Sequence, residues 1–179
     1  MIRKTKYLII IVLTLNIMFV FQGCKKDDGD GFQLNLFTVQ DDVTFGMQVR
    51  DEIASNPADF PVLKESQYPD AYDHIYRIRD SILNTGLVDY DDLFEWELYI
   101  IHNDTVLNAF ATPGGYLYFY TGLINFLDNE SEFAGVLAHE IAHSARRHST
   151  EQLTKVYGIQ LLLGILLGEN SHELAPVSY

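Results

Sequence analysis

Two histidines and a glutamate that could bind and use a metal ion lie close together, at His139, Glu140 and His143. Four residues advance an α-helix by about 400°, so on a helix the two histidines lie one turn apart on one face. Both imidazoles can then reach one zinc ion, with the glutamate beside them. Zinc lowers the pKa of a bound water to about 7, and Glu140 can accept its proton as the water attacks a peptide carbonyl. The spacing therefore predicts a zinc site with His139 and His143 as ligands and Glu140 as catalytic base.

The alternative interpretation is a structural helix with two hydrogen-bonded histidines and a surface glutamate. The residues around the motif argue against it, because most of them are apolar: Phe133, Ala134, Val136, Leu137, Ala138 and Ala142. A charged His-Glu-His group has little reason to lie on a buried helix unless a metal holds it. We therefore expect a metal centre on this helix.

A further histidine, His148, follows nine residues after His139. On a continuous helix this separation is about 900°, which places the two side chains on opposite faces. A longer type of zinc motif needs a Gly three residues and a His six residues after His143, where this chain has Arg146 and Ser149. We therefore expect His148 to lie at a helix end or outside the metal ligands.

Two helices are expected before the motif. The first runs from Asp41 to Asn56, with Asp41 or Asp42 as its cap and Pro57 beyond its end. The second runs from Pro69 to Asn84, with a proline in the first turn and an apolar face made by Ile75, Ile78 and Ile82.

Strand patterns separate these helices from the motif. Apolar and polar residues alternate over residues 94–100, residues 105–112 suit a second strand, and residues 116–120 suit a third. Pro113-Gly114-Gly115 is a strong turn signal between the last two. Helix returns after Gly122, and a long helix begins with Ser131 as its cap and reaches at least Arg147. The order predicts an α+β fold with a small antiparallel sheet of three strands.

A resemblance to a known family covers roughly residues 90–165. It rests on five segments: Asn108-Ala109-Phe110-Ala111-Thr112-Pro113-Gly114-Gly115, Tyr118 to Gly122, Glu130-Ser131-Glu132, Val136 to His143, and Arg147-His148-Ser149. In order and spacing they closely resemble the gluzincin family that contains the CAAX prenyl endopeptidase, the HtpX-type heat-shock peptidases and the periplasmic β-barrel assembly-enhancing peptidase. The resemblance implies a zincin-like fold, one zinc ion held by His139 and His143, and Glu140 as base.

The same resemblance implies where a substrate lies. The strand at residues 106–112 matches the edge strand along which the family aligns a peptide, which gives as substrate-binding residues Val106, Asn108, Ala109, Phe110 and Ala111. Backbone pairing to an open edge tolerates many sequences, which suits cleavage of misfolded or misassembled envelope proteins. The alternative is that this strand belongs to an ordinary core sheet.

The family's third metal ligand is a glutamate in a Glu-x-x-x-Asp pattern on a later helix. Only 36 residues follow His143, and neither Glu169 nor Glu173 stands in that pattern. We therefore expect the C-terminal helices and the third ligand to lie beyond residue 179, with residues 41–179 forming the N-terminal part of the peptidase domain. The apolar run at residues 156–168 is too short to span a bilayer and predicts a packed helix.

Two other functions stay open at this point. One is a lipoprotein with the same fold that never completes a metal site and acts as a binding or chaperone-like module. The other is a zinc hydrolase that does not cleave peptides, which would need a closed small-molecule pocket instead of an open strand edge.

The N-terminus predicts export. Arg3, Lys4 and Lys6 precede an uncharged apolar stretch that ends at Gly23, as in a signal peptide over residues 1–23. The chain's single cysteine, Cys24, follows at once, in the position of a bacterial lipoprotein's lipid-bearing residue. Lipid on Cys24 would hold the protein at the membrane without a spanning helix. A retained anchor and a soluble secreted form are the alternatives.

Charge limits the partners further. Residues 24–40 begin with a charged, glycine-containing segment and predict a solvated tether. Removing residues 1–23 takes away three positive charges and no acid, so the net charge moves from -13 to -16. So acidic a domain repels nucleic acid and excludes it as a partner. We expect a lipid-anchored protein of a Gram-negative-type cell envelope, on the periplasmic or the surface-exposed side of the outer membrane.

Overall fold

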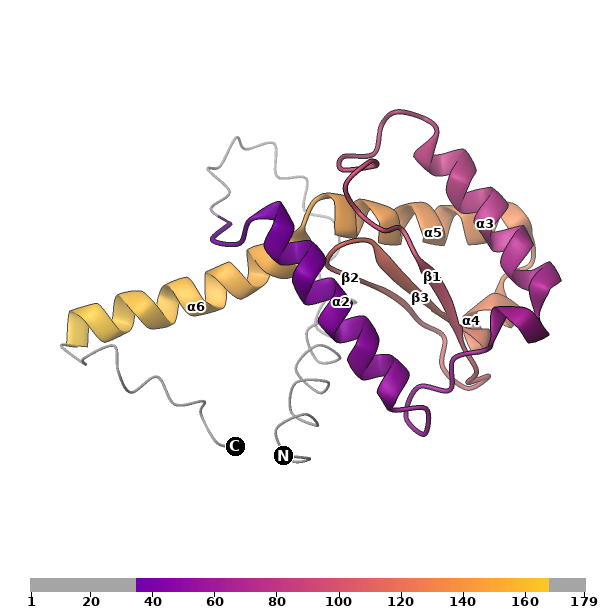
Figure 1. Ribbon diagram of the computed structural model, residues 1–179, viewed down its shortest axis with the longest axis horizontal. Coiled ribbons are helices and arrows are strands. Elements are labelled where there is room, and N and C mark those ends of the chain that lie inside the picture. Colours follow the sequence, from indigo (N-terminus) through magenta and orange to yellow (C-terminus); the bar gives the residue numbers. More distant parts are fainter. Residues whose placement is uncertain (1–34, 168–179) are drawn as a thin grey trace. The chain divides into compact units, whose positions relative to one another are not determined.

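The computed structural model describes the backbone of residues 35–167 and the side chains as far as residue 158. The signal segment, Cys24, Glu169 and Glu173 lie outside the described residues. The elements in order are α2 Val39–Ser55, the 3-10 helix η2 Glu65–Gln67, α3 Pro69–Leu83, β1 Leu98–Ile101, β2 Ala109–Thr112, β3 Tyr116–Tyr120, α4 Thr121–Phe126, α5 Glu130–Ala145 and α6 His148–Leu167. Helices surround a small sheet, so the predicted α+β class is confirmed (Figure 1).

The sheet is mixed, which corrects the predicted antiparallel arrangement. Its strand order is β1-β3-β2, with β3 antiparallel to β2 but parallel to β1. A tight turn with Gly114 and Gly115 at φ of 78° and 88° joins β2 to β3, as the sequence indicated. The loop after β1 forms no hairpin, because Asn103 receives a hydrogen bond from the backbone of Gly122 and donates one to Thr121 at the start of α4. This loop carries the chain past β3, so β2 lies at the far edge.

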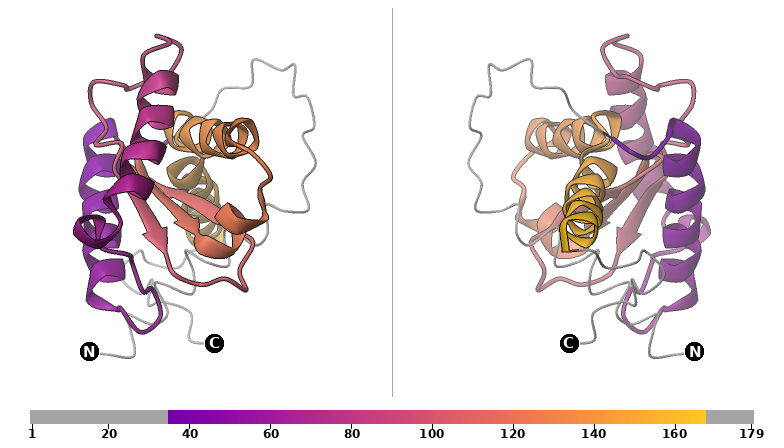
Figure 2. Two further views of the ribbon diagram at one scale, coloured as in Figure 1. Left: turned by 90° about the vertical axis from the view of Figure 1, so that its right-hand side faces the viewer. Right: turned by 90° about the vertical axis from the view of Figure 1, so that its left-hand side faces the viewer.

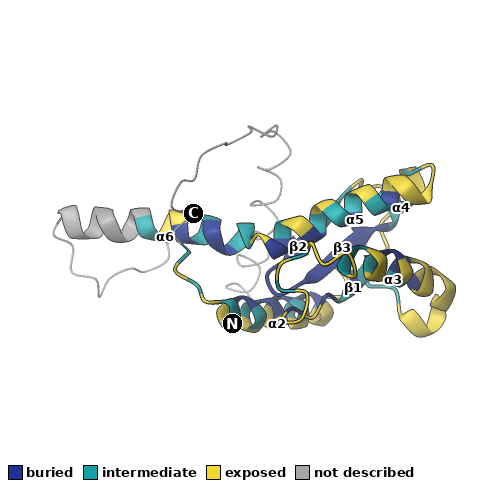
Figure 3. Ribbon diagram, turned by 90° about the horizontal axis from the view of Figure 1, so that it is seen from above, coloured by how far each residue is buried: buried dark blue, intermediate teal, exposed yellow. Residues whose placement is uncertain are grey.

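The two faces of the sheet pack differently. Apolar side chains of all three strands face α3 and α5 and form the core with them, and Phe119 lies 5.0 Å from Phe133 between ring centres. On the other face Tyr118 stacks between Tyr99 and Phe110, with ring centres 5.1 and 4.7 Å away. Helix α2 lies on this second side (Figure 2). The strands are therefore the most buried layer, between helices on both sides (Figure 3).

Helix α2 begins earlier than predicted and the tether ends earlier. Thr38 caps α2 in a capping box with Asp41, so Asp42 is not the cap and lies buried. Just before it, Asn35 donates a hydrogen bond to Thr150 and the Leu36 amide donates one to Thr154. Residues 35–38 are thus bound to α6 or to α2 instead of belonging to the solvated tether.

The long motif helix is interrupted. Asn129, not Ser131, caps α5, because its side chain accepts a hydrogen bond from the backbone amide of Glu132. The helix ends at Ala145, and Arg147 takes a left-handed φ of 57° before α6 begins at His148. The predicted single helix through Arg147 is therefore wrong.

Within the part of the chain that the structure describes, no helix is long and apolar enough to cross a membrane.

The close approach of α2 to the β2–β3 turn gives a first prediction. A Cβ atom added at Gly46 would lie 1.9 Å from the Pro113 carbonyl oxygen and 2.8 Å from the Tyr116 ring, so a backbone shift would be needed. We expect Gly46→Ala to lower the free energy of unfolding by about 1–3 kcal/mol, measured by urea denaturation. Gly135→Ala is the matched control in α5, where nothing lies within 4 Å, and should gain up to about 1 kcal/mol. Equal effects of the two changes would contradict this account of the packing.

Candidate metal centre

Helix α5 brings the two predicted ligands together. The Nε2 atoms of His139 and His143 lie 2.9 Å apart, and the rings stand at 85° to each other. Two imidazole nitrogens on one tetrahedral zinc ion, each at about 2.0–2.1 Å, are separated by roughly 3.3 Å. The pair therefore fits a shared metal ion with only a small adjustment of the rings. This agrees with the prediction from the four-residue spacing.

Glu140 lies on the same helix against the sheet edge. The backbone N–H of Ala111 donates a hydrogen bond to its carboxyl group, and the side chain is partly buried. Burial raises the pKa of Glu140 to about 7, and the Ala111 hydrogen bond opposes part of this rise. A carboxyl group with a pKa near the working pH can both take up and release a proton, as a general base must.

Strand β2 runs along this edge with alternate backbone groups directed outward. The Asn108 carbonyl accepts a hydrogen bond from the Tyr120 amide, so Asn108 and Phe110 pair with β3. The backbone groups of Ala109 and Ala111 consequently point away from β3. Among the described residues no strand pairs with β2 on that side. The edge is thus open where Glu140 lies.

The five predicted substrate-binding residues do not share one orientation. Val106 lies in the loop before β2, and Phe110 is buried with its ring on Tyr118. Asn108 uses its carbonyl within the sheet. Only Ala109 and Ala111 direct their backbone groups outward. A role of all five residues in substrate binding stays a prediction.

His143 is in contact with a third histidine through its second ring nitrogen. Its Nδ1 atom lies 2.7 Å from Nδ1 of His148, the first residue of α6. Burial, and then the neighbouring His139 and His148, lower the pKa of His143 to about 4, so its ring is neutral near pH 7. A neutral imidazole is the form that binds a metal. The expectation that His148 lies at a helix end is confirmed, but the continuous helix assumed for it is not.

A third protein ligand is not found within the described residues. No group of three His, Cys, Asp or Glu side chains there could hold a metal ion. Glu151, on the first turn of α6, forms an ion pair with Lys155 at 2.7 Å. The donor set described is therefore two imidazoles, which fit zinc but do not by themselves complete a catalytic zinc site.

The corner between α5 and α6 is fixed by a contact that the sequence did not reveal. The Arg147 guanidinium donates hydrogen bonds to the Asp42 carboxylate and, at 2.6 Å, to the Phe37 carbonyl. Asp42 is 1% exposed. The only sequence signal was an acidic residue at the start of α2, which fits a helix cap equally well.

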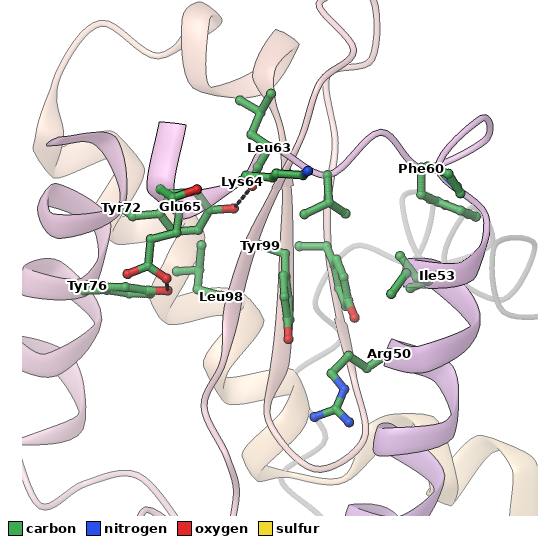
Figure 4. Close-up of a pocket in the computed structure, with 15 residues that line it drawn as sticks. Arg50, Ile53, Phe60, Leu63, Lys64, Glu65, Tyr72, Tyr76, Leu98 and Tyr99 are labelled. Atoms are coloured by element: carbon green, nitrogen blue, oxygen red, sulfur yellow. Dashed lines mark hydrogen bonds between the residues drawn. The ribbon is translucent and has the colours of Figure 1, made fainter. Parts of the chain in front are cut away.

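A cavity of about 650 Å³ lies away from these residues. It lies on the side of the sheet where Tyr118 stacks on Tyr99. Its lining includes Arg50 and Ile53 of α2, Tyr72 of α3 and Tyr99 of β1 (Figure 4). None of its lining residues belongs to the His-Glu-His group. The His-Glu-His group therefore lies outside this cavity, beside an open strand edge.

Two converging imidazoles, a partly buried carboxyl group of raised pKa and an open strand beside them define a metal-hydrolase type of centre. Comparison with known sequences agrees: the model of peptidase family M48 matches residues 75–174, more than half of the chain. The chain belongs to peptidase family M48. The resemblance inferred from the motif segments is thereby confirmed.

Individual relatives match over shorter stretches. Mitochondrial metalloendopeptidase OMA1 of Saccharomyces cerevisiae is 38% identical over 77 residues, which are 42% of this chain and 22% of the relative. The beta-barrel assembly-enhancing protease of Yersinia pestis is 47% identical over 53 residues, 30% of this chain and 11% of the relative. A putative protease of this kind from Vibrio cholerae is 35% identical over 98 residues, 48% of this chain and 20% of the relative. The matches span about a fifth or less of these relatives.

The raised pKa of Glu140 predicts how the stability of the metal-free chain depends on pH. The ordinary value is 4.5 and the folded value is about 7, so the folded chain binds an extra proton between these limits. The lowered pKa of His143 makes the free energy of unfolding rise between about pH 4 and 6.5, but the contribution of Glu140 should fall as pH rises through its own window and level off above pH 7. We expect Glu140→Gln to remove this decline, so that the variant is the more stable protein at pH 8 but not at pH 4. Thermal unfolding from pH 4 to 8 measures it.

The exposed Glu95 provides the control for this measurement, because Glu95→Gln should leave the decline in place. Parallel stability profiles for the wild type and Glu140→Gln would contradict the assigned burial of Glu140.

Proposed function

We propose that this chain carries the active-site helix of a zinc-dependent endopeptidase. The observation that carries the proposal is the placement of α5, which brings two imidazole nitrogens to 2.9 Å and sets Glu140 against the outward backbone of β2. Membership in peptidase family M48 supports the same reaction class. The metal and the base would lie within one turn of α5, and the peptide substrate would lie along β2, beside that turn.

Each residue then has a distinct task. His139 and His143 would hold the zinc ion, and Glu140 would take the proton from the attacking water and pass it to the leaving amine. Zinc, when bound, supplies a Lewis acid that polarises the peptide carbonyl and acidifies water. The N–H of Ala111 would orient the Glu140 carboxyl group, whose pKa burial raises to about 7 in the metal-free chain.

The substrate class follows from the strand edge. The backbone groups of Ala109 and the carbonyl of Ala111 can pair with an extended peptide without reading its side chains, while the Ala111 N–H is bonded to Glu140. Folded proteins rarely present a free extended segment, so unfolded or misassembled proteins are the substrates proposed. Several relatives bear the name beta-barrel assembly-enhancing protease, among them those of Yersinia pestis and Escherichia coli, which is consistent with misassembled envelope proteins as targets.

Attachment to the membrane through lipid on Cys24 is a further part of the proposal. Its support is the sequence alone: a basic start, an apolar run, Gly23 and then the chain's single cysteine. The protein would act in the cell envelope, tethered to one side of the outer membrane.

The mechanism predicts different effects for two substitutions in the motif. Glu140→Gln should leave zinc affinity unchanged, because the imidazoles remain, and should reduce hydrolysis of casein by the whole gene product about 10²- to 10⁴-fold. His139→Ala removes a ligand and should weaken zinc binding as well. Competition with a chelating dye measures the affinity, and release of labelled casein fragments measures the activity.

Equal casein hydrolysis by wild type and Glu140→Gln, after chelator-controlled assays, would rule out the proposed base. A wild-type protein that folds but neither binds zinc nor cleaves casein would favour the alternative function, a lipoprotein that acts as a binding or chaperone-like module.

The anchoring proposal has its own test in cells. Cys24→Ser should abolish lipid attachment and release the protein from the detergent-phase membrane fraction, since no lipid could be joined to the side chain. Metabolic labelling with a fatty acid and washing with high salt distinguish the cases. Retention of the Ser variant in the membrane would instead indicate a retained N-terminal anchor.

A further inference from the structure

Three histidine rings form a row at the junction of α5 and α6. His143 stands in the middle, with its Nε2 atom 2.9 Å from His139 and its Nδ1 atom 2.7 Å from Nδ1 of His148. The ring centres of His143 and His148 are 4.9 Å apart and the rings stand at 70°. Both distances are those of hydrogen bonds, so the row constrains where the protons lie.

A neutral imidazole carries one proton on one of its two nitrogens. If His143 carries it on Nδ1, this N–H donates to the lone pair on Nδ1 of His148, and Nε2 of His143 is bare. If His148 donates instead, the proton of His143 must lie on Nε2, where a metal would bind. Only the first arrangement allows His143 to act as a ligand.

We propose that His148 is a positioning residue that accepts the Nδ1 proton of His143 and so keeps the Nε2 atom of His143 unprotonated, as binding to a metal requires. The inference rests on the proposed zinc site and adds to it a residue that does not touch the metal. Histidine ligands in proteins usually donate their second N–H to such a partner, and loss of the partner commonly weakens metal binding.

The backbone at the junction explains how His148 reaches this place. A continuous helix would turn His148 to the face opposite His139. Instead Arg147 takes a φ of 57°, which breaks the helix and directs the chain into α6. The hydrogen bonds of Arg147 to Asp42 and to the Phe37 carbonyl hold this left-handed residue in place. The first residue of the new helix thus returns to the side where His143 lies.

Burial of His148 is compatible with the acceptor role. The ring is partly buried, and its Nδ1 atom lies 2.7 Å from Nδ1 of His143. The neutral form can accept on Nδ1 while it carries its own proton on Nε2.

The first test uses the metal-free chain and does not depend on activity. Nitrogen-15 NMR of the histidine side chains distinguishes the tautomers. In the wild type, His143 should carry its proton on Nδ1. In His148→Ala that proton should move mainly to Nε2, and in His148→Asn, whose side-chain oxygen can accept, it should stay on Nδ1. A wild-type His143 protonated on Nε2, or the same tautomer in wild type and His148→Ala, would overturn the proposal.

The second test measures zinc affinity of the same proteins by competition with a chelating dye. We expect His148→Ala to weaken zinc binding by about 10- to 100-fold, the range found when such partners are lost, and His148→Asn to restore most of it. His102→Ala, at an exposed histidine in the loop after β1, is the matched control and should bind as the wild type does. Full affinity in His148→Ala would refute the positioning role.

The two tests separate this inference from the proposed function. A wild type that fails to bind zinc would remove the metal from the proposed function, while the tautomer measurement would still decide the role of His148. Circular dichroism checks that the variants fold. If His148→Ala does not fold, His148→Asn decides: loss of the Nδ1-protonated tautomer in that variant overturns the proposal, and its retention supports it.

Discussion

The buried ion pair between Asp42 and Arg147 is the contact on which the geometry of the centre depends. It joins residues 105 positions apart in the chain and fixes the start of α2 to the corner between α5 and α6. A buried charge pair stabilises a fold only if further hydrogen bonds satisfy it. Arg147 gains one from the Phe37 carbonyl, whereas the second Asp42 oxygen has no partner among the described residues. The pair therefore contributes more to the shape of this corner than to the total stability.

That shape determines the electrostatics of the site. With α5 held against β2 and α6 folded back at His148, both Glu140 and His143 are partly buried. Burial has opposite consequences for the two groups, because it disfavours the charged form of each: the pKa of Glu140 rises to about 7 and that of His143 falls to about 4. One constraint thus places a carboxyl group with a pKa of about 7 one residue along the helix from His139, and a neutral imidazole four residues along it.

Local signals were enough for the motif and the helices before it. The four-residue spacing placed His139 and His143 together, and Pro69 marked the start of α3 at the correct residue. The parallel pairing of β1 with β3 could not be predicted, because it depends on Asn103 bonding to Thr121 and Gly122, a tertiary contact. The helix break at Arg147 had no Gly or Pro to announce it. A left-handed arginine costs about 1–2 kcal/mol, and its hydrogen bonds to the distant Asp42 and Phe37 offset that cost.

The two edges of the sheet show why the open strand lies where it does. The outer edge of β1 is covered in part, since Val62 forms a bridge with Ile101 and the Leu63 amide donates to the Ile100 carbonyl. The outer edge of β2 has no such cover among the described residues. An unpaired edge is an aggregation risk that proteins usually limit by keeping the strand short, and β2 has four residues. Its inward side chains at Ala109 and Ala111 are small, which lets α5 approach closely enough for Glu140 to bond the Ala111 amide. The small side chains of this short strand therefore also allow Glu140 to lie beside its open edge.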